Sequence, residues 1–315
     1  MMAQLRHRWT ALVVVLGVFA AVAVPASAQE GTPLARVEAL EEAAYGQVRQ
    51  GSLLARVEAL EKDLFGSVQQ GALLDRLSRL NGLFYAPASD GISLMMRLAA
   101  AEWVLLGQMG SGAVEPRVQT LEELLMGEPQ GGSVLARLNA IARMIWPDGK
   151  VNVAQRQIPA GTRVSLRLEA EVNSATARVG QTIPFTVVRD VSVDGDLVIL
   201  AGARGAARVS EVQAAGGLGR NGKITLDFGT ILAFDGTPVA LGITQKTSNS
   251  GSEELAAAAG LTGVLLVGAA STVVLAPVGL AAGALIQGQN VVLPSGTEMV
   301  VEVTRAVPVT ALRGL

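Results

Sequence analysis

The chain of 315 residues contains no cysteine and only one histidine, His7. Without cysteine the protein has no disulfide, no thiolate nucleophile and no cysteine-ligated metal. We expect His7 to be removed with a signal peptide, which leaves a mature chain with neither residue type. This excludes Ser-His-Asp and Cys-His catalysis and histidine-ligated zinc. The composition therefore predicts a protein that is not an enzyme and that has no metal and no cofactor.

Aromatic residues are also scarce, at 3% of the chain, and the net charge is only −2. A nucleic-acid-binding domain carries a clear excess of basic residues, so this net charge gives no reason to expect a nucleic-acid partner. A glycosidase would need a carboxylate pair in a sugar-binding cleft. The C-terminal half holds only three aromatic residues, Phe185, Phe228 and Phe234, so an enzyme is a distant third hypothesis.

Residues 1–28 have the pattern of a secretory signal peptide. Arg6 and Arg8 supply the positive start, residues 11–24 form a short apolar core, and Ala26-Ser-Ala28 is a small-residue cleavage site. An uncleaved N-terminal anchor is the alternative, but the apolar core is short for a spanning helix. We expect an exported mature chain that begins at Gln29.

Residues 29–147 contain an internal repeat. The segment Arg-Val-Glu-Ala-Leu-Glu occurs at Arg36–Glu41 and again at Arg56–Glu61, and further copies follow at steps of 20 or 21 residues. Apolar residues recur at intervals of four, three and four, which makes one face of an α-helix. The repeat predicts six helices of about 14 residues with loops of about six, stacked into a bundle or a short α-solenoid.

Two residue types mark the ends of these predicted helices. Glycine follows four of them, where a left-handed residue ends a helix: Gly46, Gly66, Gly107 and Gly127. An arginine stands near the start of each and could form a ligand face: Arg36, Arg56, Arg76, Arg97, Arg117 and Arg137. Glutamate occurs five residues later in four copies, so Arg–Glu pairing between neighbouring helices, or simple solvation, explains the arginines better. The ligand hypothesis needs all six arginines on one line of the surface.

Pro147-Asp-Gly149 ends the helical domain, and residues 148–315 show the period of β-strands. Asp194-Gly195 between two apolar runs predicts a two-residue hairpin. One phrase recurs three times and predicts a tight turn before a strand: Ile158–Thr162, Ile199–Ala203 and Leu293–Thr297. The third copy lies beyond a long apolar stretch, so we expect one all-β barrel or sandwich domain that continues after it. The chain is therefore predicted to be α+β, with two domains.

Two further motifs lack the requirements of a binding site. Asp190, Asp194 and Asp196 lack the ligand spacing and the closing glutamate of a calcium loop, and the Asp-Gly pair favours a hairpin. The glycine-rich run 216–222 lacks the Lys-Ser/Thr of a phosphate loop. We interpret this run as a loop between strands, whose Arg220 could contact an envelope partner.

The stretch from Leu255 to Ile286 has 32 residues without a charged side chain. Because strands are predicted on both sides, the stretch must leave and return on one side, which favours an apolar helical hairpin broken between Gly268 and Pro277. Each arm of about 13 residues would be about 20 Å long, too short for a bilayer core of about 30 Å. The hairpin could dip into a membrane, line an oligomer or cover the domain's own core. The residues expected at a membrane or oligomer contact are Gly260, Gly268, Pro277, Gly279 and Gly283.

The β-domain resembles the C-terminal domain of TrbI-like proteins in the order of its short phrases. The phrases are Ile158–Thr162, Asn173-Ser174, Val187–Val191, Leu200–Ala203, Asp235–Leu241, then an apolar insert and Leu293–Thr297. TrbI-like proteins build the outer-membrane core of type IV secretion and conjugation channels. The resemblance implies a β-barrel whose inserted helical hairpin contributes to a membrane ring. The chain departs from that family at its N-terminus, where a signal peptide and a helical repeat replace a cytoplasmic tail, an inner-membrane helix and a proline-rich linker. We therefore do not expect this chain to have the secretion activity of that family.

These observations favour a non-enzymatic scaffold or assembly protein of a diderm cell envelope, exported to the periplasm or the outer membrane. We expect a homo-oligomer that contacts a membrane or another envelope protein through the apolar hairpin. The alternative is a periplasmic binding module that holds a polymer or protein ligand on the arginine-bearing helices, with the hairpin folded into its own core.

Overall fold

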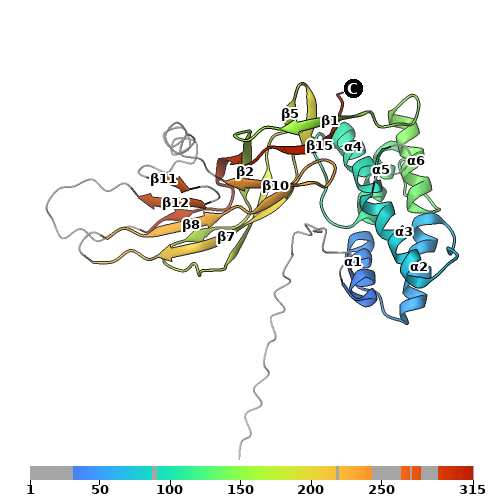
Figure 1. The fold of residues 1–315 in the computed structure, drawn as a ribbon, viewed down its shortest axis with the longest axis horizontal. Coiled ribbons are helices and arrows are strands. Elements are labelled where there is room, and N and C mark those ends of the chain that lie inside the picture. The colour runs from blue at the N-terminus through green and yellow to red at the C-terminus, as the bar shows by residue number, and fades with distance from the viewer. Residues whose placement is uncertain are drawn as a thin grey trace, which may run out of the picture.

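The computed structural model describes residues 31–86, 91–217, 220–242, 264–269, 272–277 and 290–314. Six helices come first and curled β-sheets follow, which confirms the predicted α+β class and its order (Figure 1). The predicted signal peptide, residues 1–28, lies outside the described residues. The helices are α1 (Pro33–Tyr45), α2 (Leu53–Phe65), α3 (Leu73–Tyr85), α4 (Leu94–Leu106), α5 (Val114–Met126) and α6 (Val134–Ile145).

Capping residues mark most of the helix ends. A serine or threonine hydroxyl accepts a hydrogen bond from the first turn at four N-termini: Thr32, Ser52, Ser93 and Ser133. The four predicted C-terminal glycines adopt the left-handed conformation, which confirms that part of the prediction. The apolar stripe faces inward, so that Val57, Leu60 and Leu64 of α2 are fully buried.

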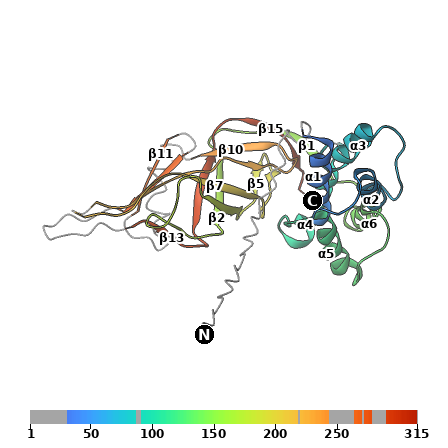
Figure 2. The ribbon, with the colours of Figure 1, turned by 90° about the horizontal axis from the view of Figure 1, so that it is seen from below.

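The six helices form two similar halves. In the first half the helices begin at residues 33, 53 and 73, and in the second at 94, 114 and 134. In each half every helix contacts the other two, and the halves meet through the pairs α3–α4, α1–α5 and α2–α6. Helices of an open solenoid contact only near neighbours. Contacts between the first and fifth repeats therefore make this domain a bundle, one of the two predicted arrangements (Figure 2).

Residues 153–312 supply the strands. They are β1 (Val153–Ile158), β2 (Arg163–Leu168), β3 (Val172–Asn173), β4 (Thr182–Val187), β5 (Val191–Val193), β6 (Asp196–Ile199), β7 (Arg204–Gln213), β8 (Lys223–Asp227), β9 (Thr230–Leu232), β10 (Pro238–Gly242), β11 (Val264–Ala269), β12 (Thr272–Pro277), β13 (Val292–Leu293), β14 (Glu298–Val303) and β15 (Val307–Leu312). A nine-stranded sheet has the order β11-β12-β8-β7-β4-β2-β14-β10-β9, and a four-stranded sheet has the order β1-β15-β6-β5. The predicted hairpin at Asp194-Gly195 joins β5 to β6.

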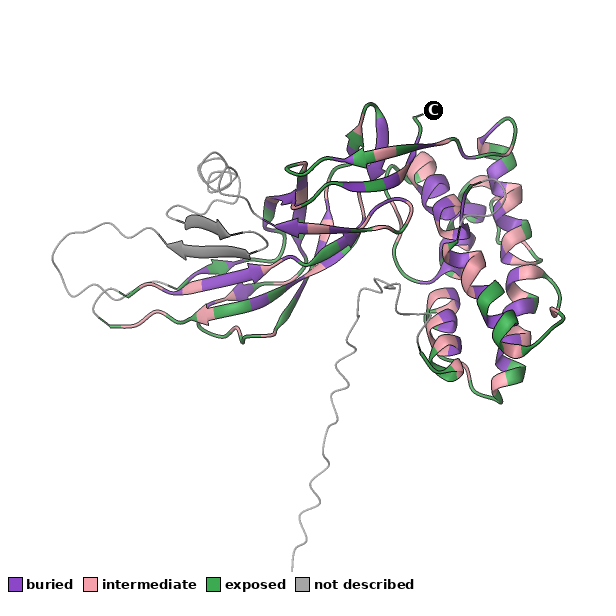
Figure 3. Ribbon diagram, in the orientation of Figure 1, coloured by how far each residue is buried: buried purple, intermediate pink, exposed green. Residues whose placement is uncertain are grey.

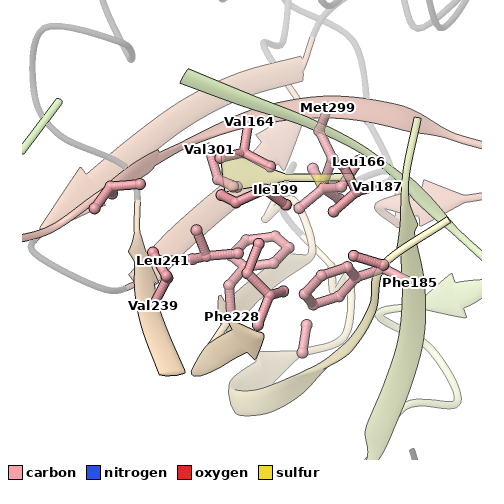
Figure 4. Close-up of a cluster of buried hydrophobic side chains, with 14 of the residues drawn as sticks. Val164, Leu166, Phe185, Val187, Ile199, Phe228, Val239, Leu241, Met299 and Val301 are labelled. Atoms are coloured by element: carbon pink, nitrogen blue, oxygen red, sulfur yellow. The ribbon is translucent and has the colours of Figure 1, made fainter. Parts of the chain in front are cut away.

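The nine-stranded sheet curls around its own core. Strand β9 packs against β7, and a side chain on Gly205 would overlap the ring of Phe185 and lie 2.9 Å from Ile231. Only glycine at this position lets the two strands approach so closely. Inside the curl, the rings of Phe185 and Phe228 lie edge to face, with centroids 5.8 Å apart (Figure 4). Buried and exposed residues alternate along the strands, as Figure 3 shows.

The strands after the apolar stretch return to the same sheets as those before it. Strand β14 pairs with β2 and with β10, and β15 pairs with β1. This confirms that the apolar stretch is an insert within one β-region.

The prediction of a helical hairpin is wrong for the two segments of the insert that the structure describes. Residues 264–269 and 272–277 form antiparallel strands β11 and β12, and β12 pairs with β8. Two of the four residues in the run 264–267 are valine, and β12 begins with Thr272, Val273 and Val274. Such β-branched side chains favour strands over helices. The remaining parts of the predicted hairpin, 255–263 and 278–286, lie outside the described residues. Among the described residues, no helix has the length and apolar character needed to cross a membrane.

Candidate functional site

The repeated arginines and glutamates form a ladder inside the helical bundle. Each carboxylate lies fifteen residues before the arginine that it binds, so every rung joins one repeat to the next. The arginine donates two hydrogen bonds, from Nε and Nη2, to the two carboxylate oxygens. The four rungs are Glu41–Arg56, Glu61–Arg76, Glu102–Arg117 and Glu122–Arg137, with Nη2–Oε2 distances of 2.6–2.7 Å. Arg–Glu pairing between neighbouring helices is therefore confirmed.

The same carboxylates also hold the loops between helices. Each accepts a backbone N–H from the residue eight positions later: Arg49, Gln69, Gly110 and Gln130. A glutamate thus fixes both the loop that follows its helix and the first turn of the next helix. All four rungs are buried, with arginine side chains 6–8% exposed. A buried ion pair is tolerated when further hydrogen bonds satisfy its charged groups, and each of these carboxylates accepts three, two from the arginine and one from the loop.

The ladder is interrupted where the two halves of the bundle meet. Asn81 stands five residues after Arg76, where the other copies have glutamate, and the next arginine is Arg97. Arg97 instead hydrogen-bonds Asn139, which lies 42 residues later in α6. Arg36 makes the equivalent contact in the first half, to Ser78, also 42 residues later. The first arginine of each half therefore binds the third helix of the same half.

In two of the four rungs, the pairing lowers the pKa of the glutamate carboxyl group. Burial alone would raise the pKa of the Glu122 carboxyl, but hydrogen bonds from Arg137 and from the Gln130 N–H outweigh it and lower the pKa below 4.5. The pKa of Glu61 is lowered for the same reasons, with Arg76 and Gln69 as donors. The hydrogen bond to Glu122 raises the pKa of Arg137. Both partners are therefore held in their charged forms.

These pKa shifts predict how acid affects the helical bundle. A carboxyl whose pKa is lowered on folding stabilises the fold at pH values above its ordinary pKa of 4.5 and loses that contribution as pH falls below it. With His7 the only histidine, we expect stability to stay flat from pH 7 to 5 and to fall below pH 4.5. Urea unfolding followed by circular dichroism at pH 7, 5, 4 and 3 measures this. A loss of stability between pH 7 and 5, or none by pH 3, would contradict it.

The six arginines predicted as a ligand face are thus placed in two ways. Arg56, Arg76, Arg117 and Arg137 are buried and bound to glutamates, whereas Arg36 and Arg97 are half-buried and bind Ser78 and Asn139. An external ligand of the four buried arginines would have to break an ion pair first. The four buried arginines therefore stabilise the bundle. The ligand face stays a prediction that this geometry does not support.

A seam joins the helical bundle to the β-region. The indole Nε1 of Trp103 in α4 donates to Asp190 at 2.8 Å, and the second oxygen of Asp190 accepts the Ala201 N–H at 2.7 Å. In the loop after α4, the Met109 N–H donates to the Ala201 carbonyl at 2.8 Å. Five buried apolar residues that follow the helices belong to the core of the bundle: Val151, Leu197, Leu200, Phe234 and Leu312. The two parts therefore share an apolar core as well as hydrogen bonds.

Sequence reasoning missed this seam. The phrase at residues 199–203 indicated only a turn, yet a side chain on Gly202 would overlap the Met109 carbonyl oxygen and lie 3.1 Å from its nitrogen. Gly202 also has a φ of +86°, which favours glycine. In the sequence, the only local signal of this close approach is the glycine itself, and it does not identify the segment that packs against it.

The three aspartates considered as a calcium loop serve three separate purposes. Asp190 belongs to the seam, Asp194 occupies the hairpin turn with φ +51°, and Asp196 forms an ion pair with Arg156. Over the ranges that the structure describes, no cluster of acidic or histidine side chains could hold a metal ion.

The two described strands of the apolar insert, β11 and β12, lie at one edge of the nine-stranded sheet. Strands β8, β12 and β11, which we name the distal wing, extend away from the helical bundle (Figure 1). Of the residues predicted at a membrane or oligomer contact, Gly268 lies in β11 and Pro277 ends β12. Gly260, Gly279 and Gly283 lie outside the described residues. Their predicted contacts stay a prediction.

No protein-family model matches the chain, and no curated protein matches it.

Proposed function

We propose that this protein is a non-enzymatic scaffold of the cell envelope that is exported and assembles with copies of itself through the apolar insert 255–286. One observation carries the proposal. An uncharged apolar hairpin, β11–β12, forms the outer end of a sheet whose strand β12 is already paired on both sides. A long apolar segment in this position calls for an apolar environment, which another copy or a membrane supplies.

The remainder of the chain suits a scaffold. The bundle is held by buried ion pairs between successive repeats, and its core continues into the β-region at Phe234 and Leu312. These features join the two parts through packing and hydrogen bonds, as a structural protein requires. The pattern of Arg6, Arg8 and the cleavage site at Ala28 supports export to the periplasm or the outer membrane.

The proposal is tested on expressed full-length protein in diderm cells. The envelope is washed with high salt and then with carbonate, and the retained protein is extracted with mild detergent for mass measurement by light scattering. We expect the protein in the washed pellet and, after extraction, a mass that is a multiple of the single chain (32.4 kDa before cleavage). A soluble periplasmic protein and an outer-membrane protein serve as the two markers.

Two results would contradict the proposal. Protein that stays in the cytosolic fraction would exclude export. Protein that washes out and behaves as a monomer would mean that the insert is covered within its own chain.

A further inference from the structure

Within the sheets that the structure describes, the outer edge of β11 differs from every other edge. Strand β9 is three residues long and packs against β7, and β5 is three residues long beside a register shift. Strand β1 carries Arg156, and β3 and β13 have two residues each. Proteins protect sheet edges by shortness, bulges, charge or cover. Strand β11 has six residues in regular register, without charge or proline, and pairs only with β12 among the described strands.

We propose that β11 pairs edge to edge, antiparallel, with β11 of a second copy, so that two nine-stranded sheets join through their distal wings. The proposal rests on the proposed function, because it names the contact through which the copies assemble. Antiparallel pairing of two identical strands is generated by a two-fold axis, the commonest symmetry of protein dimers. Each backbone N–H and carbonyl on the free edge of one strand then meets its counterpart on the other.

The chain after β12 is too short to cover this edge itself. Pairing of Leu275 with Ile224 places the end of β12 at the start of β8, and Asn290 accepts a hydrogen bond from Ala215 in the loop before β8. The residues between, 278–289, therefore start and finish at one end of the distal wing. Their full reach is about 40 Å. A segment that followed the six residues of β11 and then returned to its starting end would need about 40 Å. This equals the full reach of residues 278–289, so no residues would be left for a turn.

The part of the apolar insert just before β11 has the wrong composition for a strand partner. Residues 255–260 read Leu-Ala-Ala-Ala-Ala-Gly, and alanine and glycine are depleted in strands. The run Val264–Val267 is rich in strand-forming residues and uncharged. The same run from a second copy matches it in both length and polarity, which makes a second copy the fitting occupant.

The absence of cysteine makes crosslinking a direct test. Single-cysteine variants are made at four positions of β11 (Leu265→Cys, Leu266→Cys, Val267→Cys and Gly268→Cys), and detergent-extracted variants are mixed in pairs and oxidised. A disulfide needs Cβ atoms about 4 Å apart, so only directly opposite residues react. In antiparallel pairing, as one cysteine moves forward along the strand, its best partner moves back by the same step. Val273→Cys and Val274→Cys in β12, which is paired on both sides, are the controls and should not crosslink.

The outcomes separate this inference from the proposed function. If the protein is oligomeric, its β11 cysteines crosslink in the antiparallel pattern and the β12 control cysteines do not crosslink, the result supports both the scaffold proposal and the β11–β11 contact. Oligomers that do not crosslink at β11, or that crosslink in a parallel pattern, overturn the edge-to-edge contact and leave the scaffold proposal standing. Extracted protein that is monomeric by light scattering contradicts the proposed function and this contact together. Far-ultraviolet circular dichroism confirms that each variant is folded.

Discussion

Replacing Glu122 with alanine is expected to lower the free energy of unfolding by about 3 kcal/mol, since it removes two of the three hydrogen bonds that the buried guanidinium of Arg137 makes to carboxylates. Glu122 is fully buried, accepts two hydrogen bonds from Arg137 and holds the Gln130 N–H in the following loop. Glu115 is partly exposed and also contacts Arg137 at 2.6 Å, so the arginine keeps one charged partner. Glu115 does not supply the two bonds from Glu122 or the bond that holds the Gln130 N–H. Urea unfolding followed by circular dichroism measures the change.

Glu123 provides the matched control for that substitution. It is the next residue of the same helix and is exposed, so Glu123→Ala should change stability by no more than about 0.5 kcal/mol. Equal effects of the two substitutions would show that the ladder does not stabilise the bundle.

Replacing Gly202 with alanine is expected to open the seam between the helical bundle and the β-region. The added methyl group would overlap the Met109 carbonyl and break the hydrogen bond from Met109 to Ala201. The backbone strain of an alanine at positive φ adds to this, for a total of about 3 kcal/mol. We expect thermal unfolding by calorimetry to change from one transition to two, because the parts then unfold separately.

Gly161 separates the strain from the overlap. It lies in the same recurring phrase with φ +82°, but a side chain there would meet nothing within 4 Å. Gly161→Ala should therefore cost only the strain, about 1–2 kcal/mol, and should leave a single transition. If Gly161→Ala split the transition as well, the seam would not be what joins the two parts.

The sequence predicts those features that depend on neighbours along the chain. The six helices, their terminal glycines and the pairing of Glu41 with Arg56 follow from a repeat of about 20 residues, because spacing determines which side chains share a helix face. The hairpin at Asp194-Gly195 follows from its turn residues.

The features that the sequence left open depend on contacts between distant residues. Trp103 and Asp190 are 87 residues apart, and no periodicity links them. The apolar insert was misassigned for a different reason. A long uncharged run satisfies the requirements of a buried helix and of a buried strand equally, and only the β-branched residues of 264–267 and 272–274 distinguish the two. Pairing of β12 with β8 then decides the outcome through tertiary contacts.

The most direct test of the central claim is the mass of the exported protein in mild detergent. The account predicts an assembly of two or more chains, held together through the insert 255–286. A single chain of the mature mass, obtained under conditions in which circular dichroism shows intact helices and strands, would contradict it.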